Sequence, residues 1–263
     1  MYYLRNLIAL FLAAVVVLGC GGGGDEPSKP STPTSADPPT APAAGKPVDP
    51  STAGSISGSV SYSGEPGRKA RIRMNADPNC AGQHSSPVYA QNLEINENGT
   101  LQYAFVFVKA GLEDYAFQPP AEAATLDQRG CLYTPRVLGI QTGQELKVSN
   151  SDETTHNINP SPANNRDWNV SQAPKSDPIV RRFARSEIMI PVKCNVHPWM
   201  KAYIGVVAHP YFSVSGNDGS YSLQGLPPGE HTVEVWHEKL GAQEQKITVT
   251  ANQAATLDFN YGG

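Results

Sequence analysis

The sequence predicts an all-β protein with little or no helix. Short stretches alternate apolar with small or polar residues, as in Ser55–Gly64, and this period of two is typical of strands. Turn sequences such as Gly64-Glu65-Pro66-Gly67 and Asn217-Asp218-Gly219 separate these stretches. The part after the first 53 residues is long enough for one large or two small β domains.

Residues 1–20 are typical of an export signal. Arg5 precedes a short apolar run that ends at Leu18, which is too short to span a bilayer. The ending Leu18-Gly19-Cys20 resembles a bacterial lipobox, which implies cleavage before Cys20 and lipidation of that cysteine. The alternative is an ordinary secretory signal with a spare thiol. The resemblance implies a protein anchored in the cell envelope, at the outer membrane facing the periplasm or at the cell surface.

Residues 21–53 are predicted to form a disordered tether. They contain a four-glycine run and many Pro, Ser and Thr residues, with almost no large apolar side chain. Such a segment cannot bury enough surface to offset its chain entropy, and its prolines favour extended conformations. The tether would hold the folded part away from the membrane.

The folded part begins with the strand of residues 55–63. Further strands are expected at residues 70–74 and 101–108, and between 138 and 148 around a turn at Gly143-Gln144. Two more, at residues 183–192 and 202–208, flank a loop with unusual chemistry. Only residues 121–127 have a weak helical pattern.

That loop carries Cys194, His197 and Met200 at the spacing C-x2-H-x2-M. A thiolate, an imidazole and a thioether form a soft ligand set, and a blue-copper site adds a second imidazole. His156, in the stretch Val148–Ile158 where a strand runs into a polar loop, is the obvious donor. Two alternatives remain: a zinc site, which normally needs a second Cys/His pair, and an inert loop with Met200 packed in the core.

The order N-S-D-x-x-x-H-N followed by C-x2-H-x2-M resembles the cupredoxin family, most closely the short ligand loop of amicyanins. The resemblance implies a Greek-key β-sandwich over residues 54–210, holding one type 1 copper ion for single-electron transfer. It assigns His156, Cys194, His197 and Met200 as ligands and makes His197, near the surface, the port for the electron. An apolar patch would dock a cytochrome or dehydrogenase partner; its residues are Val196, Pro198 and Trp199.

Cysteine usage is consistent with this interpretation. If Cys20 carries lipid and Cys194 binds metal, Cys80 and Cys131 remain, and in an oxidising compartment they are most simply a disulfide. Pairing of Cys194 with either of them is the competing arrangement and would destroy the site.

Residues 211–263 resemble the carboxypeptidase regulatory-like, transthyretin-like β-sandwich, through the pattern D-G-x-Y-x-L-x-G-L-P-P-G-x-H-x-V-x-V-W. About 50 residues are few for a complete sandwich of this kind. The strand of residues 55–63 resembles the first strand of the same module, so the copper domain could be inserted within the module or share a sheet with it. Pairing of that strand with the C-terminal strands would support the insertion.

Composition and motifs argue against several classes of function. The formal net charge is −4 with no basic block, so nucleic acid is not an expected partner. No nucleotide loop or Ser/His/Asp signature occurs and no second histidine cluster is present, so we do not expect an enzyme. Two rivals to the electron carrier remain: a copper-binding or storage module, and a structural surface protein whose sandwich binds glycan or another protein.

Overall fold

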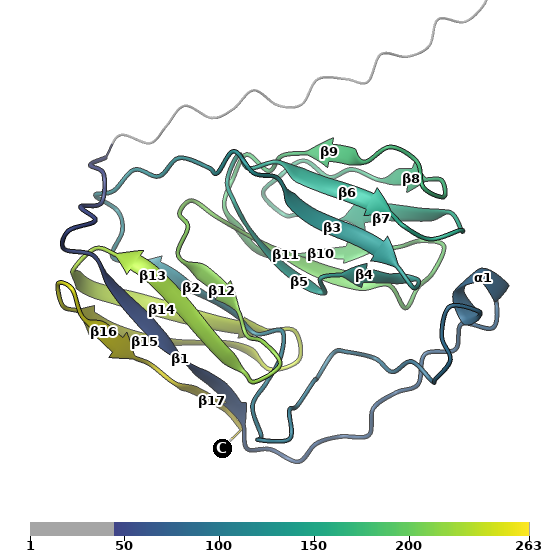
Figure 1. The fold of residues 1–263 in the computed structure, drawn as a ribbon, viewed down its shortest axis with the longest axis horizontal. Helices are drawn as coiled ribbons and strands as arrows, with labels where there is room; N and C mark the ends of the chain where they lie inside the picture. Colours follow the sequence, from purple (N-terminus) through teal and green to yellow (C-terminus); the bar gives the residue numbers. More distant parts are fainter. Residues whose placement is uncertain (1–44, 263) are drawn as a thin grey trace, which may run out of the picture. The chain divides into compact units, whose positions relative to one another are not determined.

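The computed structural model describes residues 45–262, all within one compact unit. The expected signal peptide, Cys20 and the first part of the tether lie outside the described residues. The all-β prediction is confirmed: the described residues form seventeen strands and one four-residue helix (Figure 1). No helix in this part of the chain is long and apolar enough to cross a membrane.

The strands form two β-sandwiches. The first, here called the ligand sandwich, pairs the sheet β5-β11-β10-β7-β8 with the sheet β4-β3-β6-β9. Its strands are β3 (Ala124–Arg129), β4 (Leu132–Thr134), β5 (Val137–Gln141), β6 (Leu146–Asn150), β7 (His156–Pro160), β8 (Val170–Gln172), β9 (Ile179–Arg181), β10 (Glu187–Lys193) and β11 (Lys201–Val207). Leu126, Val148, Ile158 and Ile204 come from both sheets and are fully buried in its core.

The second, here called the terminal sandwich, pairs the sheet β13-β1-β16, with β17 also on β1, against the sheet β12-β2-β14-β15. Its strands are β1 (Gly54–Tyr62), β2 (Phe105–Ala110), β12 (Phe212–Val214), β13 (Ser220–Leu226), β14 (Gly229–His237), β15 (Gly241–Val249), β16 (Ala254–Thr256) and β17 (Phe259–Tyr261). Along β14, burial alternates as its sequence predicts, with Val233 and Val235 in the core.

Strand β1 lies in the middle of its sheet. It pairs antiparallel with β13 and parallel with β16 and β17, so the first strand of the folded part joins the last ones. Gly58 is needed in this strand, because a Cβ there would lie 1.8 Å from the carbonyl oxygen of Leu257. The terminal sandwich therefore contains strands from both ends of the folded part, and the strands of the ligand sandwich lie between them in the sequence.

Three local expectations were wrong. The expected copper-domain span of 54–210 does not follow the pairing, since β1 and β2 belong to the terminal sandwich. The tether does not extend to residue 53: Lys46 pairs with Tyr115, and Asn252 donates to the Thr52 carbonyl. The weak helical pattern at 121–127 runs into strand β3, because alternate burial of Leu126 and Gln128 in the sheet outweighs local propensity.

The one helix, α1 (Pro78–Ala81), lies in the long segment between β1 and β2. Asp77 caps its start by accepting a hydrogen bond from the Asn79 N–H, and Pro78 occupies the first turn. The predicted disulfide Cys80–Cys131 is present and ties α1 to the turn between β3 and β4. This segment therefore reaches from the terminal sandwich to the ligand sandwich.

Candidate metal centre

The strand pair β10–β11 and strand β7 bring the four predicted ligands to one end of the ligand sandwich. His156 is the first residue of β7, while Cys194, His197 and Met200 occupy the loop between β10 and β11. Two backbone hydrogen bonds close this loop, from Cys194 N to the Met200 carbonyl (3.3 Å) and from Met200 N to the His197 carbonyl (2.9 Å). All four residues are buried, with at most 3% of their surface exposed.

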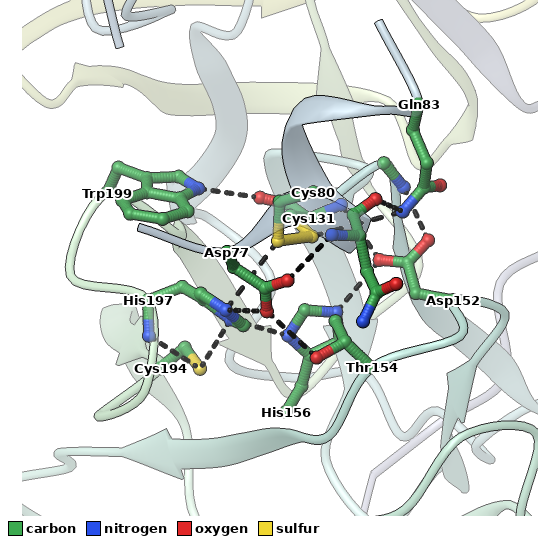
Figure 2. Close-up of a disulfide and its surroundings, with 12 residues drawn as sticks. Asp77, Cys80, Gln83, Cys131, Asp152, Thr154, His156, Cys194, His197 and Trp199 are labelled. Atoms are coloured by element: carbon green, nitrogen blue, oxygen red, sulfur yellow. Dashed lines mark hydrogen bonds and ion pairs between the residues drawn. A yellow bond between two sulfur atoms is a disulfide. The ribbon is translucent and has the colours of Figure 1, made fainter. Parts of the chain in front are cut away.

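Three donor atoms converge. The Nδ1 atoms of His156 and His197 are 2.9 Å apart, and His197 Nδ1 is 4.0 Å from Cys194 Sγ (Figure 2). One ligand atom from each of these residues lies within 4.8 Å of the others, so the three could hold one metal ion. Met200 is completely buried in the same loop.

A carboxylate faces the other nitrogen of each imidazole. His156 Nε2 lies 2.8 Å from Asp152 Oδ2, and His197 Nε2 lies 3.0 Å from Asp77 Oδ2. Both Nε2 atoms therefore carry protons, which leaves the two Nδ1 atoms free to face each other as donors for a metal. Carboxylates in this position fix the tautomer of a metal-binding histidine and strengthen it as a ligand.

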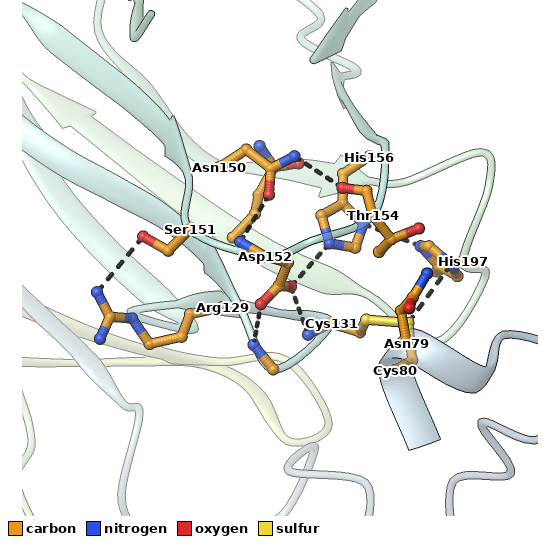
Figure 3. A network of polar contacts seen from close by, with 12 residues as sticks. Asn79, Cys80, Arg129, Cys131, Asn150, Ser151, Asp152, Thr154, His156 and His197 are labelled. Carbon is orange, nitrogen blue, oxygen red and sulfur yellow. Dashed lines mark hydrogen bonds and ion pairs between the residues drawn. A yellow bond between two sulfur atoms is a disulfide. The ribbon is translucent and has the colours of Figure 1, made fainter. Parts of the chain in front are cut away.

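Asp152 also fixes the adjoining turn. It accepts hydrogen bonds from the Gly130 N–H (2.7 Å) and the Cys131 N–H (2.8 Å), so one buried carboxylate joins the histidine to the disulfide turn (Figure 3). Gly130 and Cys131 both have positive φ, at 64° and 54°, which this tight turn requires. Sequence reasoning quoted the Asn-Ser-Asp stretch but gave Asp152 no role.

Asn157, next to His156, clamps the ligand loop to the ligand strand. Its side-chain oxygen accepts from the Asn195 N–H at 2.5 Å, and its carbonyl accepts from the Tyr133 hydroxyl at 2.6 Å. The loop that carries Cys194 is therefore held against β7 without help from a metal.

The electrostatics of the metal-free site favour a cation. Burial alone would lower the pKa of His156, but hydrogen bonds to Asp152 and Cys194 outweigh it and raise the pKa to about 9. Burial alone would raise the pKa of the Cys194 thiol, but its hydrogen bonds with His156 and backbone N–H groups lower it. The same contacts that raise the pKa of His156 therefore lower that of the neighbouring thiol, which favours the thiolate form that a metal ion binds.

The helix α1 covers His197, so the expected position of this residue near the surface was wrong. Only 2% of His197 is exposed, and its Nε2 lies 3.6 Å from Cys80 Sγ as well as beside Asp77. The Thr154 hydroxyl holds the same Asp77 oxygen at 2.9 Å. Sequence reasoning found Cys80 only as one half of the disulfide and gave Asp77 no role.

The predicted docking residues lie in the outer part of the ligand loop. Val196 is 53% exposed, Pro198 is exposed and Trp199 is partly exposed. The Trp199 indole donates from Nε1 to the Cys131 carbonyl at 3.0 Å. Their role as a docking patch stays a prediction.

Comparison with known proteins gives a match for the C-terminal part. Residues 202–261 match the carboxypeptidase regulatory-like domain, and these residues contain β11 except its first residue, as well as β12–β17 of the terminal sandwich. No curated protein matches the chain.

Solved structures of copper proteins are similar to less than half of the chain. A copper-containing nitrite reductase from Thermus scotoductus SA-01 is 18% identical over 37% of this chain and 24% of its own, with a TM-score of 0.30. This chain therefore spans about a quarter of the reductase. A purple cupredoxin from Nitrosopumilus maritimus (21% identity, 32% of this chain, 98% of its own, TM-score 0.28) and a Cu(I) amicyanin variant (14%, 38%, 97%, 0.27) also match. Likenesses at these TM-scores carry no weight for function, which has to follow from the residues of the site.

Proposed function

We propose that this chain is a type 1 copper protein that passes single electrons between redox partners in the cell envelope. The observation that carries the proposal is the convergence of His156 Nδ1, His197 Nδ1 and Cys194 Sγ, with Met200 buried in the same loop. Two imidazoles, a thiolate and a thioether are the ligand set of blue-copper sites. Copper, when bound, supplies a one-electron couple.

The residues around the site suit that role. Asp152 and Asp77 hold the two imidazoles by their Nε2 protons, and Asn157 holds the loop of Cys194, so the donor atoms are positioned before a metal binds. Ligands that cannot rearrange favour electron transfer, because little reorganisation accompanies the change in oxidation state. The burial of all four ligands also keeps water from the thiolate.

Storage of copper fits less well. A storage module must release its metal, yet the four ligands are buried, and a helix that a disulfide holds in place covers one of them, His197. We further propose that the protein is a carrier and not an enzyme, that Cys20 anchors it through lipid, and that its partner is a cytochrome or dehydrogenase.

The first test is the visible spectrum of the Cu(II)-loaded protein. We expect an intense blue thiolate-to-copper absorption band that Cys194→Ser abolishes, since the band needs the thiolate. Met200→Leu is the matched variant: it should keep the band and change the reduction potential. A wild-type protein that binds Cu(II) without this band would contradict the type 1 assignment, and tight tetrahedral binding of zinc in its place would favour the zinc alternative.

A further inference from the structure

The covered position of His197 raises the question of how an electron reaches this site. Asp77 and Cys80 close off its Nε2 atom, and Cys80 itself is fully buried (Figure 2). His156 and Met200 have no exposed surface, and Cys194 has 3%. None of the four candidate ligands therefore offers its own edge to a partner.

Trp199 connects the ligands to the surface. Its ring lies against the His197 ring, with centroids 5.1 Å apart and an angle of 43° between the planes. In the described part of the chain, it is the only aromatic ring besides the ligands themselves that contacts a ligand ring in this way. Trp199 is partly exposed, whereas all four candidate ligands are buried, so it is in contact both with the His197 ring and with solvent.

The orientation of this ring is fixed. The bond from its Nε1 to the Cys131 carbonyl ties it to the disulfide turn, and its apolar face packs on the core of the ligand sandwich. A buried or half-buried indole normally needs such a partner for its N–H. The disulfide Cys80–Cys131 therefore holds α1 over His197 and also lies next to Trp199, which is partly exposed.

We propose that Trp199, and not His197, is the port through which electrons enter and leave the site. The inference rests on the proposed function. In the outward step, a one-electron acceptor docked at the exposed edge of Trp199 is reduced by one electron and the site is oxidised by one; no bond forms or breaks and no proton moves. Trp199 would not bind the metal itself; it would act through the ring of His197, which it contacts.

The kinetic test uses the full copper-loaded protein, reduced and then mixed with hexacyanoferrate(III), a one-electron outer-sphere oxidant. We expect Trp199→Leu to slow oxidation about tenfold, which corresponds to about 1.4 kcal/mol in activation free energy. Trp199→Phe, which keeps a ring beside His197, should retain most of the rate. Trp168→Leu is the matched control, because Trp168 packs on the same core while its ring lies against the Arg181 guanidinium, 5.4 Å from the ring centroid.

Two outcomes would separate this inference from the proposed function. If Trp199→Leu keeps both the blue band and the wild-type rate, the protein is a copper carrier but its port lies elsewhere. If the wild type has no blue band, the proposed function fails before the port is tested. An unchanged spectrum and reduction potential in Trp199→Leu, with a slower rate, would support the port.

A second readout needs no copper. In the metal-free protein, we expect diethyl pyrocarbonate to leave His197 unmodified, as seen by peptide mass spectrometry, because α1 covers its Nε2. Acrylamide should quench a part of the tryptophan fluorescence that Trp199→Phe removes. Rapid modification of His197, or emission from Trp199 that acrylamide cannot reach, would overturn the proposal.

Discussion

At the scale of single residues, Asp152 has the largest role that spacing did not predict. Its carboxylate accepts hydrogen bonds from His156 Nε2–H and from two backbone N–H groups of the disulfide turn, and it is almost fully buried. Burial disfavours its ionised form, but these hydrogen bonds outweigh that effect and lower its pKa. A charged group in this position makes His156 a better ligand.

We therefore expect Asp152→Asn to weaken copper binding about 10–100-fold, the usual cost of losing such an outer partner. Competition for Cu(I) against a chromogenic chelator measures the effect. Asp127→Asn is the control, since Asp127 binds Ser151 and Arg129 and contacts no candidate ligand. Equal affinity of Asp152→Asn and the wild type would show that the carboxylate only supports the fold.

His209 predicts how stability depends on pH. Its Nε2 donates to the Val108 carbonyl (2.8 Å) while its Nδ1 accepts from the Tyr211 N–H (3.2 Å), so both contacts require the neutral ring. Burial lowers its pKa from the usual 6.5 to about 4. The unfolded chain thus binds more protons between these two values, and stability is lost as the pH falls through that window.

We expect His209→Gln to remove part of this acid sensitivity. From pH 6.5 to pH 5 the wild type should lose about 1.5 kcal/mol more than the variant, because the full slope of about 1.4 kcal/mol per pH unit is reached only below the unfolded pKa. Urea unfolding of both metal-free proteins at the two pH values measures the difference, in which other titrating groups cancel. Parallel loss of stability in the two proteins would contradict it.

At the scale of elements, the two sandwiches pack where β5 and β11 lack side chains. Gly139 and Gly205 are opposite each other in these paired strands, and the fully buried ring of Phe105 lies against Gly205. A Cβ on Gly205 would be 2.6 Å from Phe105 Cζ. Because the two glycines have no side chains, the rings of Phe105 in β2 and Phe212 in β12 pack directly against the backbone of β5 and β11.

Gly205→Ala should therefore destabilise the protein by about 1–3 kcal/mol, the typical cost of overpacking a core. The urea midpoint measures this. Gly67→Ala is the matched control, because a Cβ at that position meets no atom within 4 Å, and its midpoint should stay near that of the wild type. A midpoint for Gly205→Ala equal to that of the control would mean that the sheets separate easily at this point.

The sequence predicted elements whose signal is local. The alternation in β14, the Asn-Asp-Gly turn before β13 and the spacing of Cys194, His197 and Met200 all depend on neighbouring residues. The cover over His197 could not be predicted in this way. Asp77 and His197 are 120 residues apart, and the four-residue helix between Asp77 and Gly82 is too short to have a periodic pattern.

At the scale of the whole molecule, the strands of the ligand sandwich lie in the sequence between two groups of strands of the terminal sandwich. A buried ion pair joins the two sandwiches: Arg136, before β5, contacts Glu238, after β14, at 2.6 Å, and the Tyr203 hydroxyl donates to the same carboxylate. Arg136 also reaches the carbonyl of Lys201, next to Met200, at 3.4 Å. The terminal sandwich therefore supports the strand that leaves the ligand loop.

The pairing of β1 and β2 gives the last prediction. Each lies inside a sheet of the terminal sandwich, with β1 between β13 and β16 and β2 between β12 and β14. A fragment of residues 211–263 retains β12–β17 but lacks both inner strands. In each sheet the strands on either side of the missing one then have no hydrogen-bonded partner there. The fragment also lacks the core residues Ile56, Val60, Val106 and Val108. We expect this fragment to be unfolded, because short strands without inner partners cannot bury enough apolar surface.

Circular dichroism and the dispersion of amide NMR signals test this expectation, with residues 45–263 as the folded reference. If the fragment unfolds cooperatively on its own, β1 and β2 are additions to a complete module. If it is unfolded and the longer chain is folded, the terminal sandwich can form only after the ligand sandwich has been synthesised, when β12–β17 can pair with β1 and β2. Folding of the candidate metal centre and closure of the terminal sandwich would then be linked, since the segment between β1 and β2 also carries the cover of His197.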